Sequence, residues 1–236
     1  MSPSAPIPPA PVRLPVVAID GPAGAGKSTI ARQVALHFGL LNLESGAMYR
    51  AFALKALRSQ VEPGDEAALV ALAATTTVSL AQGENGNRVL LDGVDVTAEL
   101  REPLVTQTAS KVSVYPPIRS WMVSLQQGLG AAGGVVMEGR DIGTVVFPRA
   151  EVKIFLDASA EIRGQRRYEQ MGARGTMSLD EVICDLRERD ERDRNRLDSP
   201  LKPAEDSIVL DSSALTLDQT VQAALDIVGQ VLRRTR

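Results

Sequence analysis

Short, mostly apolar runs recur along the chain, each followed by a glycine or an acidic residue. Five of them have the length and the Val, Ile and Leu content of strands buried on both faces of a sheet: residues 16–19, 40–43, 135–138, 152–156 and 208–210. Between them, apolar residues repeat every three or four positions, as in amphipathic helices. This alternation predicts an α/β fold, with a mostly parallel five-stranded sheet, helices on both faces and right-handed crossovers.

The predicted helices have recognisable ends. The periodicity predicts helices over residues 28–38, 47–57, 66–74, near 98–114 and 118–129, and over three later segments. Ser159 and Thr216 are N-cap residues of two of these later helices. Ser178 and Glu181 form a capping box that starts a long charged helix, which Pro200 is expected to stop.

Residues from about 75 to 97 depart from this pattern. Apolar and polar residues alternate around Val78, Val89 and Val94, as in strands with one buried face. Asn85-Gly86 and Asp92-Gly93 are typical of tight hairpin turns. We therefore expect a small antiparallel β insert within the α/β domain.

The first predicted strand leads into a glycine-rich loop, and residues 21–28 match the pattern G-x-x-x-x-G-K-[ST]. Its glycines allow the backbone N–H groups to approach phosphate oxygens, at a helix N-terminus that favours negative charge. Lys27 is expected to reach the β- and γ-phosphates, and the Ser28 hydroxyl to ligate Mg²⁺. The predicted binding site for a nucleoside triphosphate comprises Gly21, Pro22, Ala23, Gly24, Ala25, Gly26, Lys27, Ser28 and Thr29.

Composition limits the partners. The formal net charge of the 236 residues is −3, which gives no general attraction to nucleic acid. No apolar run approaches the ~18 residues that span a membrane. The single cysteine, Cys184, excludes an internal disulfide and fits a reducing compartment; its apolar neighbours predict a buried structural cysteine. The lone His37 is given no metal or catalytic role.

The N-terminus differs from the rest of the chain. Residues 1–11 hold five prolines and lack the basic and apolar regions of a secretory signal. We expect residues 1–12 to form an extended tail before an α/β phosphate-loop domain over residues 13–236. Since neither a secretory signal nor a membrane span is predicted, we expect a cytoplasmic protein. No heptad pattern predicts a dimer, so we expect a monomer.

Three classes of phosphate-loop protein fit the loop itself. A guanine-nucleotide switch needs an Asn-Lys-x-Asp motif, and a transport ATPase carries a signature such as Leu-Ser-Gly-Gly-Gln; the sequence has neither. A small phosphotransferase needs arginines that neutralise two phosphorylated substrates. Arg50, Arg119 and Arg140 stand in otherwise apolar or glycine-rich settings.

Five further arginines, and no lysine, lie within residues 187–196. One interpretation is a solvated helix face on which Glu and Arg alternate. The other is a mobile lid whose guanidinium groups make bidentate contacts with anions. The sequence leaves both open.

Four segments, residues 20–29, 45–50, 138–148 and 189–196, together resemble the bacterial cytidylate kinases from about Val16 to the C-terminus. The resemblance implies transfer of the γ-phosphoryl group of ATP to CMP or dCMP, with Mg²⁺. It also implies an insert that binds the nucleoside monophosphate, at about residues 75–115, and a lid at about residues 165–200. Another nucleoside monophosphate kinase, a kinase for a metabolite such as shikimate, or a nucleotide-dependent switch module are the alternatives.

The resemblance assigns roles to individual residues. Ser45, Arg50 and Arg140 would hold the acceptor phosphate. Ser110, Arg119 and Asp141 would read the base. Contacts to the sugar and from the lid fall on Arg189, Asp193 and Arg196. The groups expected at the reacting phosphates are Lys27, Arg140, Arg189 and Arg192.

Chemistry independently supports Asp141 as a reader of cytosine. Its carboxylate would accept from the cytosine amino group and repel the oxygen that uracil presents at the same edge. An ion pair with Arg140, or a cap of the next turn, are alternative roles for Asp141. The second protein group near Mg²⁺ stays open between Glu138 and Asp141.

Overall fold

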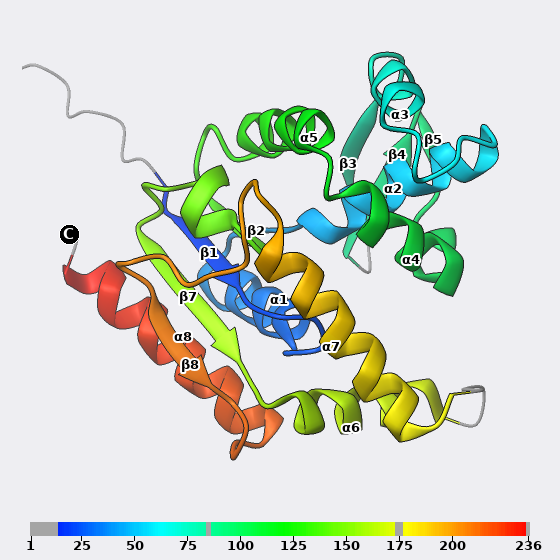
Figure 1. Cartoon of the computed structure of the whole chain (residues 1–236). Coiled ribbons are helices and arrows are strands. Elements are labelled where there is room, and N and C mark those ends of the chain that lie inside the picture. Colours follow the sequence, from blue (N-terminus) through cyan, green and yellow to red (C-terminus); the bar gives the residue numbers. More distant parts are fainter. Residues whose placement is uncertain (1–13, 84–85, 173–176, 235–236) are drawn as a thin grey trace, which may run out of the picture.

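The computed structural model describes residues 14–83, 86–172 and 177–234, and a five-stranded parallel sheet forms its centre (Figure 1). The strand order is β2-β6-β1-β7-β8. The strands are β1 (Val16–Asp20), β2 (Leu41–Glu44), β6 (Val135–Gly139), β7 (Val152–Asp157) and β8 (Ile208–Asp211). This arrangement confirms the predicted fold class and all five predicted strands.

Helices cover both faces of this sheet. Because successive strand residues point to opposite faces, β1 contributes to two apolar clusters. Val17 and Ile19 pack with α1 (Lys27–Phe38) and α8 (Leu217–Arg234). On the other face, Val16 and Ala18 pack with a π-helical turn (η2, Ile142–Val146) and α5 (Pro116–Leu129).

A second group of elements has an apolar cluster of its own and lies at the upper right of Figure 1. It contains the antiparallel sheet β3-β4-β5, which confirms the predicted β insert. Its members are α2 (Ser45–Arg58), α3 (Glu66–Ala73), β3 (Val78–Gly83), β4 (Gly86–Leu91), β5 (Val94–Asp95), η1 (Glu99–Arg101) and α4 (Pro103–Val112). The predicted turn residue Asn85 lies outside the described residues.

Helix α5 belongs to both groups. Its Ile118 and Met122 are buried in the cluster of the insert, whereas Val123 and Leu129 pack against the cluster on the central sheet. The helix therefore joins the two parts of the fold.

Helix α6 (Ala160–Met171) lies below α1 in Figure 1, and α7 (Leu179–Asn195) runs diagonally from the region of β2 down to α6. The predicted caps are confirmed: Ser159 Oγ accepts from Ile162 N, and Ser178 and Glu181 form the capping box. The prediction for Cys184 is wrong, because its side chain is exposed. The buried positions of α7 follow one face, through Val182 and Leu186, and Cys184 lies off that face.

The strand register brings the chemistry-bearing segments together. Asp20, the last residue of β1, is paired with Gly139 of β6, and Glu44 of β2 is paired with Glu138. The segments that follow these strands therefore leave the same edge of the sheet, where open α/β folds bind ligands. Across the described ranges, no helix combines the length and the apolar character needed to span a membrane.

Candidate functional site

The glycine-rich loop folds tightly between β1 and α1. A Cβ on Gly21 would lie 1.9 Å from the carbonyl oxygen of Leu156, and Gly21 has φ +149°, so only glycine fits there. Lys27 is 5% exposed, and its Nζ donates to the carbonyl oxygen of Pro22 at 2.6 Å. The loop thus places a buried ammonium group beside the N-terminus of α1.

The surroundings of Lys27 disfavour its positive charge. Burial and the charges of Arg140 and Arg189 lower its pKa to about 7, although Glu138 acts in the opposite direction. A lysine whose pKa is lowered mainly by burial, and further by nearby cations, becomes fully charged when an anion binds beside it. Lys27 is therefore suited to binding phosphate.

The side-chain oxygens of Ser28, in α1, and Glu138, in β6, lie close together. The Ser28 hydroxyl donates to Glu138 Oε1 at 2.9 Å. Among the described residues, no group of three His, Cys, Asp or Glu side chains could enclose a metal ion. Mg²⁺, however, commonly uses one or two protein oxygens together with substrate phosphates, and this pair fits that need. Of the two candidates from the sequence, Glu138 is therefore the better placed.

The charges of Arg140 and Arg189 act on Lys27, and that of Arg50 in turn acts on Arg189. Arg50, from α2, lies 3.7 Å from Glu44. Arg140 follows β6, and its Nε donates to Asp193 at 2.8 Å. Burial, followed by the charge of Arg140, lowers the pKa of Arg189 to about 10, and Arg50 adds to this effect. These predicted phosphate-binding residues therefore lie within electrostatic reach of one another.

The predicted base-reading residues form a second, adjoining network. Arg119 is 3% exposed and donates from Nη2 to Asp141 Oδ2, and Arg196 Nη2 lies 3.8 Å from Asp141 Oδ1. The Arg119 guanidinium lies 5.8 Å from the centroid of the Tyr49 ring. Asp193 connects the two networks, because it pairs with Arg140 and, at 3.5 Å, with Arg196.

Both alternative roles for Asp141 are wrong. Within the described part of the chain, Arg140 pairs with Asp193, while Asp141 pairs with Arg119 and Arg196. Asp141 precedes the π-helical turn, but its side chain makes no capping hydrogen bond. Its carboxylate is therefore oriented by two guanidinium groups.

Unpartnered polar atoms gather around these networks. Nine buried side-chain N or O atoms lack a hydrogen-bond partner among the described residues, and five of them belong to this site. They are Tyr49 Oη, Arg50 Nε, Ser110 Oγ, Arg119 Nε and Arg196 Nη2. Buried polar groups are normally hydrogen-bonded, so this concentration indicates a site for a polar ligand.

The Ser45 hydroxyl, predicted to hold phosphate, donates to the backbone carbonyl of Glu138 at 2.7 Å. It therefore joins the start of α2 to the end of β6, close to the phosphate-side residues. Its role in binding stays a prediction.

The arginines of residues 187–196 divide between the two interpretations. Arg187 pairs with Glu161, and Arg192 is 40% exposed and pairs with Glu188 at 3.9 Å, as on a solvated face. Arg189 and Arg196, by contrast, belong to the networks described above. The predicted catalytic residue Arg192 is thus not brought to Lys27.

Several residues of the site were missed from the sequence. The Asp20 carboxylate accepts from the backbone N–H groups of Ile142 and Gly143 at 2.8 and 2.7 Å, and burial raises its pKa to about 6. An acidic residue directly after a buried strand was the available signal. Tyr49 lies within residues 45–50, one of the segments that carry the resemblance. The buried pair Arg163 and Asp190 could not be told apart from the other charged residues of its helices.

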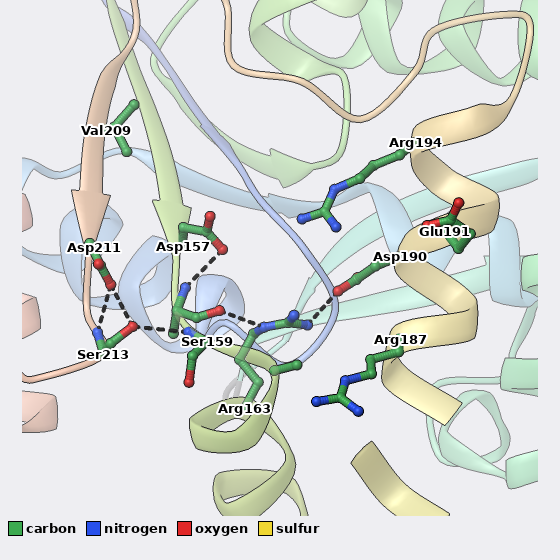
Figure 2. Close-up of a pocket in the computed structure, with 12 residues that line it drawn as sticks. Asp157, Ser159, Arg163, Arg187, Asp190, Glu191, Arg194, Val209, Asp211 and Ser213 are labelled. Atoms are coloured by element: carbon green, nitrogen blue, oxygen red, sulfur yellow. Dashed lines mark hydrogen bonds and ion pairs between the residues drawn. The ribbon is translucent and has the colours of Figure 1, made fainter. Parts of the chain in front are cut away.

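A cavity of about 670 Å³ lies beyond the ends of β7 and β8. Figure 2 shows Arg187 and Arg194 extending from α7 on one side, with Asp157 and Asp211 at the strand ends on the other. Arg163 and Asp190 also line this cavity and contact Ala23 of the phosphate loop. The cavity therefore adjoins the loop.

The chain is similar to known kinases. The family model described as cytidylate kinase matches residues 17–230. A cytidylate kinase of Pasteurella multocida is 44% identical over 92% of this chain and 96% of the relative. One from Pelotomaculum thermopropionicum is 49% identical over 88% of this chain and 93% of the relative. A solved structure of a shikimate kinase from Acinetobacter baumannii in complex with shikimate is 15% identical, covers 94% of each chain and has a TM-score of 0.45.

Proposed function

Since this chain belongs to the cytidylate kinase family, we propose that it transfers the γ-phosphoryl group of ATP to CMP or dCMP at the junction of the phosphate loop and the insert. It is an ATP-dependent phosphotransferase that acts on small nucleotides. The observation that supports this location best is that five buried polar atoms without a hydrogen-bond partner among the described residues belong to the networks of Arg50, Arg119 and Arg196.

On the donor side, the loop N–H groups and Lys27 bind the phosphates of ATP. When Mg²⁺ is bound, it neutralises charge on the donor phosphates. Ser28 and Glu138 are the residues that would hold it, because their oxygens already lie 2.9 Å apart. Arg189, whose charge acts on Lys27, stabilises the negative charge that develops during transfer.

On the acceptor side, Arg50 and Arg140 bind the phosphate of CMP. Arg119 and Arg196 orient the Asp141 carboxylate, which accepts from the cytosine amino group, and the unpartnered Ser110 hydroxyl is available to the same nucleotide. An ionised phosphate oxygen is already nucleophilic, so we assign no general base. Arg192 remains a candidate only if α7 moves.

We place the nucleoside of ATP in the cavity beyond β7 and β8, because this cavity adjoins Ala23 of the loop. The remaining assignments are proposals of the same kind: an acceptor-binding insert at about residues 75–115, a lid at about residues 165–200, and a cytoplasmic monomer that does not bind nucleic acid or membranes. Light scattering tests the monomer, with the mass of a single chain expected.

The most informative test is a panel of acceptors with ATP and Mg²⁺. We expect CMP and dCMP to be phosphorylated with far higher kcat/KM than UMP, AMP or shikimate, as measured by coupled ADP release. A higher rate with AMP or shikimate would favour the corresponding alternative. ATP hydrolysis that no acceptor accelerates would favour a switch module.

Asp141→Ala tests the base-reading role. Losing a buried carboxylate contact is expected to lower kcat/KM for CMP by about 100-fold and to reduce the preference for CMP over UMP. The KM for ATP serves as the internal control, because Asp141 is assigned to the acceptor. An unchanged CMP/UMP ratio would show that Asp141 does not read the base.

A further inference from the structure

A buried ion pair that makes no direct contact with the acceptor networks binds the phosphate loop. Arg163 of α6 and Asp190 of α7 are 4% and 2% exposed, and Arg163 Nη1 lies 2.6 Å from Asp190 Oδ2 (Figure 2). Asp190 Oδ1 accepts from the Ala23 N–H at 3.0 Å, and Arg163 Nη1 donates to the Ala23 carbonyl at 2.8 Å. Both backbone polar groups of one loop residue are thus bound by this pair.

Packing fixes the same contact. Ala23 packs with Val182 and Leu186 of α7, and a Cβ on Gly24 would lie 3.4 Å from Arg163 Cβ. Arg163 Nε also donates to the carbonyl oxygen of Ala158, just after β7, at 2.8 Å. The loop is therefore connected both to α7 and to the end of the central sheet.

Stability alone does not explain a charged pair at this place. Burying two charges carries a desolvation cost that often cancels their attraction, and apolar replacements are commonly neutral or stabilising. The pair does something that apolar side chains cannot, because it binds one N–H and one C=O of the same residue. Such contacts define the local path of the backbone.

The pair also positions a residue of the proposed reaction. Asp190 follows Arg189 on α7, so anchoring Asp190 to Ala23 sets where Arg189 lies relative to the loop. Arg189 is near enough to Lys27 for its charge to act on that group. Because α7 holds the loop, the donor site in the loop and Arg189 keep a fixed position relative to each other.

We propose that Arg163 and Asp190 are positioning residues for phosphoryl transfer, which fix the phosphate loop through Ala23 and couple it to Arg189. This inference rests on the proposed donor site in the loop. It assigns to the pair no contact with the reacting atoms.

The test compares Asp190→Ala with Asp190→Asn in the full-length chain. Asp190→Ala removes the acceptor for the Ala23 N–H and is expected to lower kcat/KM for ATP by about 10- to 100-fold. Its Kd for CMP, measured through the fluorescence of the only tryptophan, Trp121, is expected to change less than about twofold. Asp190→Asn keeps an acceptor oxygen and is expected to recover most of the loss.

Arg163→Lys provides a second test if Asp190→Ala fails to fold. A lysine keeps the charge, but its single nitrogen cannot replace both the Nε and the Nη1 contacts. We expect a raised KM for ATP with an unchanged Kd for CMP. Glu169→Ala, at an exposed position of α6, is the matched control and is expected to change neither value.

Two outcomes overturn the proposal. One is an unchanged kcat/KM for ATP in folded Asp190→Ala or Arg163→Lys. The other is a parallel loss of thermal stability, CMP affinity and activity that Asp190→Asn does not reverse, since that pattern marks a purely structural pair. Lys27→Met tests the proposed donor site separately from the role of the ion pair. If this variant keeps full activity, the proposed donor site itself is wrong.

Discussion

Lys27 is a buried lysine whose protonation depends on the other charged residues of the site. It is buried, it donates to the carbonyl of Pro22, and burial with the charges of Arg140 and Arg189 lowers its pKa to about 7. Phosphate groups would reverse this effect, because negative charge nearby favours the protonated ammonium. ATP binding and protonation of Lys27 are therefore linked.

This linkage predicts proton uptake on ATP binding at pH 8. With a pKa of about 7, Lys27 is neutral in roughly nine-tenths of the ATP-free protein at pH 8, so the binding of ATP should be accompanied by the uptake of close to one proton. Calorimetric titration in buffers of different ionisation enthalpy measures this number directly. Lys27→Met is the control and should take up none. A heat that does not depend on the buffer would contradict the lowered pKa.

Lys27 is also expected to be essential for turnover. Lys27→Ala should reduce kcat by about 100-fold or more, because the protein acts mainly by positioning and neutralising the phosphates. Lys202→Ala, at an exposed position far along the sequence, is the comparison and should keep the kcat of the unsubstituted enzyme. Near-normal turnover of Lys27→Ala would refute the donor site.

Single residues differed in how well they could be predicted. Lys27 and Ser28 follow from a local pattern, so their setting between β1 and α1 was predictable. The partner of Arg140 was not, since Asp193 lies 53 positions away and only the tertiary fold brings it close. Cys184 was predicted to be buried because its neighbours are apolar, but it lies off the buried face of α7.

At the scale of elements, α7 carries arginines on more than one face. Its capping box and its length were visible in the sequence, but a run of alternating Glu and Arg does not say which side turns inward. The π-helical turn after Asp141 was not predicted at all. It follows from a tertiary contact, in which Asp20 binds the N–H groups of Ile142 and Gly143.

The junction of β1 with the phosphate loop gives a prediction at this scale. In Gly21→Ala the new Cβ would meet the Leu156 carbonyl at 1.9 Å, so β1 and β7 would have to separate. We expect a loss of about 3 kcal/mol or more in the free energy of unfolding, measured by urea denaturation.

Gly93→Ala is the matched control for that change. Gly93 also has a positive φ, but no atom of the described residues lies within 4 Å of the position that its Cβ would take. Only backbone strain remains, at a cost of about 1 kcal/mol. Equal losses of unfolding free energy in the two variants would show that the close approach of Gly21 to β7 does not add to the cost of the substitution.

At the scale of the whole molecule, the proposed acceptor site lies between two apolar clusters that α5 connects. The fold class and the small antiparallel sheet were predictable, because each follows from local periodicity. The composition of the site was less so, since Tyr49, Arg119, Asp141 and Arg196 come from α2, α5 and the segments after β6 and α7. Only the resemblance to a family assigned Arg119, Asp141 and Arg196 to one site, and it gave no role to Tyr49.

A ligand at this junction should stabilise the whole fold. At 100 times its Kd, CMP is expected to add about 2.7 kcal/mol, and hence about 5–10 °C in Tm. UMP at the same concentration should raise Tm much less. Differential scanning fluorimetry checks this, with Arg119→Met expected to lose the CMP shift and keep the ATP shift. Equal shifts with CMP and UMP would contradict a cytosine-selective site.

The contacts of Asp20 have a consequence for redesign. This carboxylate binds the main chain of Ile142 and Gly143, and not the Asp141 side chain, to which we assign recognition of the base. The position of this segment and its proposed selectivity for a nucleobase therefore depend on different atoms. Position 141 can be exchanged to seek new substrates while the segment keeps its place beside the donor loop.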